Sequence, residues 1–310
     1  MVAHAEYGEV FNFQNLCSIL GFRLTGEETV KSISFFACDE FGQNAPLAGR
    51  FRVDPSSESL QMEAFGAQGY SITLNCEEPV QLDPTTPTVF YIMVPPGTYN
   101  SFSVGVSTVE DGFMIKETSN QLNLERSHIK HTSNLEFVAC EFEDLSKFGT
   151  DNSYIVTEMG NYSINASTIG NGGYGLIEGL FHTETPFITP VSAELLWEDR
   201  PGVIKFAALS NGKVCFITSE TEGNAVIAVK DDEGTILWSW HIWRTDEPQE
   251  HTYVNDQGNT YVMMDRALGS ISAVEGDIGG ALYYQWGRKD PFRLNDPHSL
   301  TDLTLHSGHP

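Results

Sequence analysis

The sequence has few positive charges, no long apolar run and no basic leader. Only 17 Lys and Arg side chains stand against 42 Asp and Glu, which gives a formal net charge of -25. Because a chain this acidic repels phosphate backbones and anionic lipids, we exclude nucleic acid as a partner. No stretch approaches the ~18 apolar residues that a membrane-spanning helix needs. The residues after Met1 also lack the basic start and apolar core of a signal peptide.

Cysteines are sparse and widely spaced. No two of the five form a C-x-x-C pair, which argues against a zinc site or a redox motif. We expect free, buried thiols, of which at least one has no partner within the chain. The residues are Cys17, Cys38, Cys76, Cys140 and Cys215.

Catalytic motifs are missing as well. The sequence contains no G-x-S-x-G, no H-E-x-x-H and no Walker A motif. His128 and His131 have metal-ligand spacing on a helix but would lie on opposite faces of a strand, so we interpret them as a solvated pair. The acidic side chains within residues 231–234 could attract calcium, although a hairpin turn explains all four residues. We predict no enzymatic activity, no cofactor and no metal.

The sequence does contain the alternation of apolar and polar residues that is typical of β-strands. Apolar residues make up 40% of the chain, and they alternate with polar ones around Phe22, Ile72 and Val104 without any clear helical period. Residues 89–94 are apolar throughout, which predicts a central strand buried on both faces. Asn211 and Gly212 form a type I′ hairpin signal between two apolar runs. We predict an all-β fold of tandem antiparallel β-sandwiches.

Domain boundaries follow from composition. Residues 141–152 are polar and rich in turn residues, and residues 244–251 form a second polar break. The sequence therefore predicts a β-sandwich over residues 1–140, a second one over residues 150–245, and an irregular, partial module over residues 250–310. We find no internal repeat.

Tryptophan is concentrated in two short blocks near the C-terminus. Trp238, Trp240 and Ile242 fall on one face of a strand, so we predict that both rings belong to the core of the second sandwich. A platform for sugars is the alternative. Charged residues beside Trp286 could form the rim of a glycan or peptide site, or Arg288 and Asp290 could form a structural pair that holds the loop. The candidate ligand-binding residues are Trp243, Trp286, Arg288 and Asp290.

Several segments resemble a known family. Five of them, in matching order, look like the β-sandwich modules of fimbrillin-like surface proteins of Bacteroidetes: residues 13–26, 30–33, 47–51, 90–99 and 122–127. The middle part, with residues 152–156 and 160–163, resembles the Ig-like module that often follows. Residues 262–269 and 282–292 look like the start of a C-type-lectin-like module.

The resemblance implies a non-enzymatic protein of the cell surface, outer membrane or extracellular space. Such proteins are secreted, lipid-anchored or associated with fimbriae, and they have structural or adhesive roles. The expected partners are a host or microbial surface glycan or protein, or other fimbrial subunits. The alternative is a carbohydrate-binding surface protein that belongs to a glycan-capture system.

Overall fold

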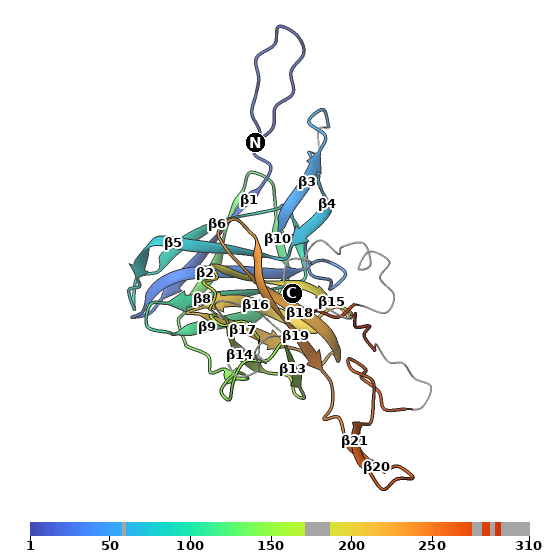
Figure 1. The fold of residues 1–310 in the computed structure, drawn as a ribbon. Helices are drawn as coiled ribbons and strands as arrows, with labels where there is room; N and C mark the ends of the chain where they lie inside the picture. Colours follow the sequence, from blue (N-terminus) through green and yellow to red (C-terminus); the bar gives the residue numbers. More distant parts are fainter. Residues whose placement is uncertain (58–59, 171–186, 275–280, 286–288, 293–310) are drawn as a thin grey trace. The chain divides into compact units, whose positions relative to one another are not determined.

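The computed structural model describes residues 1–57, 60–170, 187–274, 281–285 and 289–292. Within these ranges the chain is all β, without a helix, which confirms the predicted fold class. The chain divides into two compact units, Met1–Glu141 and Phe142–Pro310. The ribbon of Figure 1 shows the strands of each unit, and we describe the units separately.

Two sheets form the body of the first unit. The three-stranded sheet has the order β11 (Ile129–Glu136), β1 (Ser18–Thr25) and β6 (Thr88–Val94). The four-stranded sheet has the order β5 (Ser71–Gln81), β2 (Thr29–Cys38), β8 (Ser101–Thr108) and β9 (Phe113–Thr118). Two small hairpin-like pairs accompany them: β3 (Ala48–Val53) with β4 (Met62–Gly69), and β7 (Gly97–Tyr99) with β10 (Leu122–Leu124).

A single hydrophobic core joins these two sheets. Alternate residues of β1 and β6 meet alternate residues of β2 and β8 in one cluster of buried side chains. Phe22 of β1 lies 6.0 Å from Phe35 of β2, measured between ring centroids. Because successive side chains of a strand point to opposite faces, each sheet gives one face to this core and turns the other away from it. This arrangement is that of a β-sandwich.

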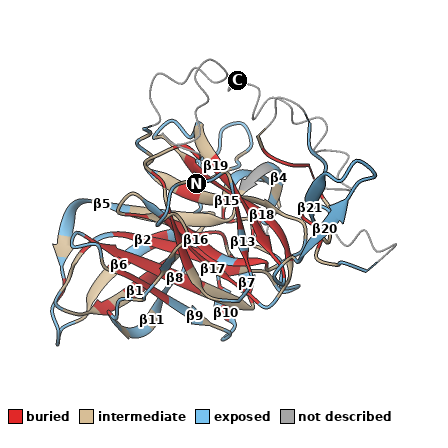
Figure 2. Cartoon of the chain, turned by 60° about the horizontal axis from the view of Figure 1, so that its bottom comes forward, coloured by how far each residue is buried: buried red, intermediate tan, exposed pale blue. Residues whose placement is uncertain are grey.

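The second unit also contains two four-stranded sheets. One has the order β12 (Glu143–Asp144), β14 (Asn161–Asn165), β17 (Lys213–Thr218) and β16 (Ile204–Ser210). The other has the order β13 (Ser153–Val156), β19 (Ile236–Arg244), β18 (Gly223–Lys230) and β15 (Ser192–Glu198). A separate hairpin follows, made of β20 (Glu250–Val254) and β21 (Thr260–Met264), and it is exposed along its whole length (Figure 2).

Both hairpins predicted in this unit are confirmed. Ser210 and Lys213 form the last pair of β16 and β17, so the turn is the two residues Asn211 and Gly212, with φ of 48° and 74°. Positive φ at both positions is what a type I′ turn requires. Between β18 and β19, the Asp231 carboxylate accepts hydrogen bonds from the Glu233 and Thr235 amides, so turn geometry accounts for this acidic residue.

The structure differs from expectation at three edge strands and at one apolar run. The sheets are antiparallel except where β11 pairs with β1, β12 with β14 and β13 with β19, all of which run parallel. Parallel pairing needs a long connection, and each of these pairs brings together segments separated in the sequence. The prediction of a central strand at residues 89–94 is wrong, because β6 is an edge strand whose Tyr91 and Met93 are exposed.

All five cysteines lie within the described residues and are free thiols. Only Cys215 is buried, and the other four are partly exposed, so the expectation of burial holds for one residue. Burial raises the pKa of the Cys215 thiol to about 12, which keeps it protonated and unreactive at neutral pH.

Replacing Trp240 with alanine tests the predicted role of this ring. Trp240 is fully buried on β19 opposite Ile227, as the sequence predicted. Trp238, which the sequence also assigned to the core, is only half buried. We expect Trp240→Ala to lower the free energy of unfolding by roughly 3–5 kcal/mol, because it removes a large apolar side chain and leaves a cavity. Urea unfolding measures this change. Met159→Ala, at an exposed position of the same unit, should change it by less than about 0.5 kcal/mol, and equal effects would contradict the core role.

Candidate functional site

The four predicted ligand-binding residues fall into two groups. Trp243 and Asp290 are 3% and 2% exposed, so protein covers both side chains. Trp286 and Arg288 lie outside the described residues. Ligand contact by these residues stays a prediction.

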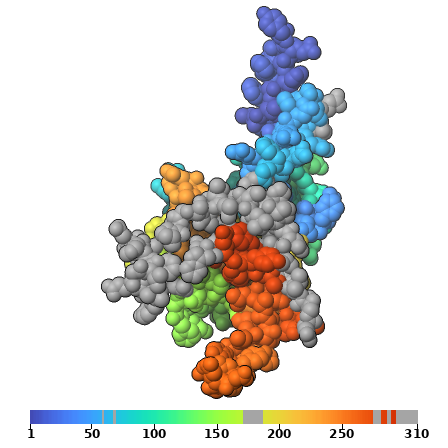
Figure 3. Space-filling model, turned by 45° about the vertical axis from the view of Figure 1, so that its right-hand side comes forward, coloured from blue at the N-terminus to red at the C-terminus, as the bar shows by residue number. Residues whose placement is uncertain are grey.

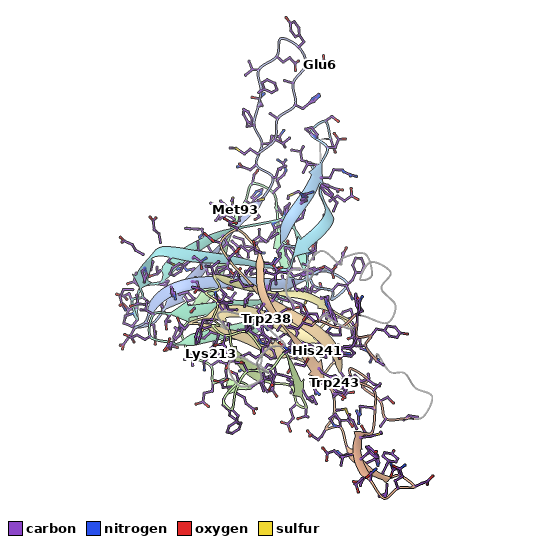
Figure 4. All side chains as sticks on the ribbon, in the orientation of Figure 1. Glu6, Met93, Lys213, Trp238, His241 and Trp243 are labelled. Carbon is purple, nitrogen blue, oxygen red and sulfur yellow. The ribbon has the colours of Figure 1, made fainter. Side chains whose placement is uncertain are left out.

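The strand β19 is covered on both faces. Its pairing with β18 places Trp240 and Ile242 on one face, and Ser239, His241 and Trp243 on the other. Figure 4 labels His241 and Trp243 on this strand. Both sets are buried. The second face therefore needs polar partners for Ser239 and His241.

Asn224 on β18 supplies one set of these partners. Its side-chain amide donates hydrogen bonds to Asp199 Oδ2 at 2.7 Å and to the Gly269 carbonyl at 2.8 Å. Its Oδ1 lies 2.9 Å from His241 Nε2. Because Oδ1 can only accept, the imidazole carries its proton on Nε2, and Nδ1 has no hydrogen-bond partner within the described part of the chain.

This arrangement shifts the protonation of His241. The pKa of His241 is lowered to about 4, mainly by burial; the carboxylate of Asp290 opposes this shift, and the positive charge of Lys289 adds to it. A neutral imidazole is therefore the form that the folded chain holds at neutral pH. It acts as a hydrogen-bond donor to Asn224.

Ser239 supplies the second polar contact. Its hydroxyl lies 2.6 Å from Asp290 Oδ2 and 2.6 Å from Lys289 Nζ, and Lys289 also donates to the Ser239 carbonyl at 2.7 Å. Lys289 and Asp290 form an ion pair. The Lys289 ammonium also lies 4.9 Å from the centroid of the Trp238 ring. The sequence predicted a structural pair of Arg288 with Asp290; Arg288 lies outside the described residues, and Asp290 pairs with Lys289.

A serine beside a lysine can form a nucleophile and base, but the contacts here favour a structural role. The Ser239 hydroxyl is buried and donates its proton to Asp290, while Lys289 is already charged and paired. A lysine that is to remove the proton of a serine must be neutral. The cluster instead ties residues 289–292 to β19.

Two further contacts hold the segment that follows β21. Arg266, whose side chain is almost fully buried, pairs with Asp246 and Asp265. Gly269 accepts the hydrogen bond from Asn224 described above. Together with the Ser239 cluster, these contacts fix the described part of residues 265–292 on the second unit.

An exposed apolar surface lies in the first unit, on the side of β11-β1-β6 turned away from the core. We call it the β1 face. Leu20, Phe22 and Leu24 of β1 enter the core, so the residues between them, and those paired with them, point outward. Its members are Ile19, Gly21, Arg23, Thr25, Val89, Tyr91, Met93, Ile129, His131, Asn134 and Glu136.

The β1 face exposes large apolar side chains. Tyr91 is 51% exposed, Met93 is 71% exposed and Ile129 is 60% exposed. The register puts Met93, Ile19 and Ile129 in one row across the three strands. The apolar run at residues 89–94 was the signal for this surface in the sequence, but a strand buried on both faces would show the same apolar run.

Gly21 lies at the centre of this surface. It separates Tyr91 from His131, whose rings meet edge to face above it with centroids 5.7 Å apart. The Tyr91 hydroxyl lies 3.3 Å from His131 Nε2. A Cβ atom at position 21 would come within 2.7 Å of His131 and 3.0 Å of Tyr91. Glycine is therefore what allows the two rings to meet.

The charge of the β1 face differs from that of the chain. The chain carries 42 carboxylates, yet Glu136, at one end, is the only one on this face. Arg23 and His131 lie near its centre. The turn before β11 adds Arg126, which is only partly exposed. The face is thus mainly apolar, with the cationic Arg23 near its centre and a single carboxylate at one end.

Neither a metal centre nor a membrane span emerges from the described ranges. Within them, no three His, Cys, Asp or Glu side chains gather into a cluster that could hold a metal ion. His128 is exposed and its Nδ1 lies 3.0 Å from the Arg126 carbonyl, while His131 contacts Tyr91. Over the same ranges, no helix has the length and apolar character needed to cross a lipid bilayer.

No protein-family model and no curated protein matches the chain.

The depressed pKa of His241 predicts a stability change between pH 6.5 and pH 4. At about pH 5 the unfolded imidazole binds a proton and the buried one does not, so stability is full above about pH 6.5 and falls as the pH drops toward 4. Between about pH 7.5 and pH 5, the free energy of unfolding of the wild type should fall by about 2 kcal/mol more than that of His241→Asn. The reason is that pH 5 lies 1.5 pH units below the ordinary pKa of 6.5, and each unit is worth about 1.36 kcal/mol. Urea unfolding at both pH values tests this, and parallel losses would contradict it.

Removing the Asp290 carboxylate tests whether the contacts of Ser239 with Lys289 and Asp290 hold the described part of residues 265–292 on the second unit. Asp290→Ala leaves the partly buried Lys289 charge without its ion pair, and we expect a loss of roughly 3 kcal/mol in the free energy of unfolding. Limited proteolysis should also cut within residues 265–292 faster than in the wild type. Asp256→Ala, at an exposed turn position, is the control. Unchanged cleavage rates would show that other contacts fix the segment.

Proposed function

We propose that this chain is a non-enzymatic cell-surface or fimbria-associated protein with a structural or adhesive role. In this proposal it acts outside the cell and binds a protein surface through the β1 face. The support comes from three sources: the resemblance to fimbrillin-like modules, the all-β architecture, and the chemistry of the exposed sheet face.

The observation that carries the proposal is the exposure of Tyr91, Met93 and Ile129 on one sheet face. The exposure of large apolar side chains to water is unfavourable, and a partner that covers them lowers the free energy of the system. Tyrosine, methionine and arginine are also the residues enriched in the centres of protein interfaces, where carboxylates are depleted. Tyr91, Met93 and Arg23 with a single carboxylate at the edge fit that composition.

The fold keeps this surface rigid. Strand β1 pairs with β6 on one side and with β11 on the other, and its inward residues are fully buried. A surface built on paired strands needs little ordering when a partner binds, so more of the contact energy appears as affinity. The bridging of Tyr91 and His131 over Gly21 adds a local constraint.

The non-enzymatic part of the proposal is supported by the contacts of Ser239. Its hydroxyl is buried and bonded to Asp290, and the neighbouring lysine is ion-paired. Neither group is free to attack a substrate in this arrangement.

Adhesion of coated beads tests the proposal. Beads that carry the chain should attach to epithelial cells, to bacterial cells or to beads coated with the same chain. The double variant Tyr91→Ser, Met93→Glu should reduce attachment at least about tenfold, because interface residues of this kind contribute about 2 kcal/mol or more. Phe148→Glu, at a highly exposed position of the second unit, is the matched control.

Two outcomes would contradict this proposal. One is that none of the three probes distinguishes the double variant from Phe148→Glu. The other is that attachment persists in the double variant and free sugars block it, since this result would favour the carbohydrate-binding alternative. A glycan array probed with wild type and double variant separates the second outcome from non-specific attachment.

A further inference from the structure

A second unpartnered apolar element lies next to the β1 face in the sequence. Residues 1–14, here called the arm, form a loop that projects from the start of β1 (Figures 1 and 3). Backbone hydrogen bonds between Val2 and Gln14, of 3.0 and 2.8 Å, close the loop. Five of its large apolar side chains are exposed: Met1, Tyr7, Val10, Phe11 and Phe13.

The base of the arm is fixed in place. Arg126 donates hydrogen bonds to Gln14 Oε1 at 3.0 Å and to the Asn15 carbonyl at 3.1 Å. Only residues 15–17 then separate the arm from Ser18, where β1 begins. For the arm to fold back over the β1 face of its own chain, the backbone would have to reverse within these residues and lose the Arg126 contacts. A second copy has no such restriction.

The arm and the β1 face match in chemistry. The arm presents aromatic and aliphatic side chains together with the carboxylates of Glu6 and Glu9, and Figure 4 labels Glu6 on it. The β1 face presents Tyr91, Met93 and Ile129 with Arg23 and His131. Apolar surfaces that also carry opposite charges favour association and fix its orientation. Elsewhere, two copies of a chain with a net charge of -25 repel each other.

We propose that the β1 face of one copy binds the N-terminal arm of a second copy. Phe11 and Phe13, whose ring centroids are 6.4 Å apart, cover Met93 and Ile129, and Glu6 and Glu9 approach Arg23 and His131. This inference rests on the proposed function and names the partner of the same surface. It makes the chain self-associating, either by reciprocal exchange in a pair or by successive contacts in a longer assembly.

Sedimentation velocity on the full chain at about 1–100 µM tests the self-association. We expect the weight-average mass of the wild type to rise with concentration. Met93→Glu on the face and Phe11→Glu on the arm should each weaken association at least about tenfold. Phe41→Glu adds the same charge at another exposed position of the first unit and should leave association unchanged.

A peptide identifies the arm as the occupant. A fluorescent peptide of residues 1–14, titrated with the full chain, should bind with an affinity that Met93→Glu lowers and Phe41→Glu does not. Arg23→Glu should weaken binding of the wild-type peptide, and a peptide with Glu6→Lys and Glu9→Lys should restore it. Such a charge swap responds to the contact itself and not to a loss of folding.

The outcomes separate this inference from the function on which it rests. A chain that stays monomeric at all concentrations and does not bind the peptide overturns the inference, and so does association that Met93→Glu abolishes but Phe11→Glu leaves intact. If beads still attach to cells through the β1 face in either case, the proposed function stands with a different partner. Loss of both results removes both proposals.

Discussion

The alternation of side chains along a strand is the constraint on which the rest of this structure depends. On β1, Leu20, Phe22 and Leu24 enter the core of the first unit, and their burial fixes which residues remain for the other face. A shift of one residue would exchange the two sets and place the leucines and the phenylalanine in water. The position of Gly21, Arg23 and the paired Tyr91 is thus a consequence of core formation.

The same constraint has the opposite result in the second unit. On β19 the register sends Trp240 and Ile242 to one face and Ser239 and His241 to the other, and protein covers both. Buried polar groups must be hydrogen-bonded, so Asn224 and Asp290 are as necessary to this strand as its apolar neighbours. The segment that carries Asp290 is held by this requirement. The tryptophan-rich strand therefore contributes to the stability of the second unit.

The two strands differ in how their side chains are covered. The β1 face combines a rigid backbone with exposed Tyr91 and Met93, so its apolar area is free to be covered by another molecule. The polar cluster on β19 has its groups bonded to one another, so it contributes order to the second unit. In a chain with 42 carboxylates, a face with one carboxylate is also where another acidic surface meets the least repulsion.

The sequence by itself determined the all-β class, the hairpins at Asn211 and Asp231 and the burial of Trp240, because these depend on alternation and on turn chemistry within a few residues. It did not determine the parallel edge pairs, which depend on where distant segments return, or the exposure of β6. The run at residues 89–94 predicts an apolar strand, but only the order of the sheet decides whether both of its faces are covered. The meeting of Tyr91 with His131 and of Ser239 with Asp290 was likewise decided by tertiary structure, because each pair joins strands or loops 40 or more residues apart.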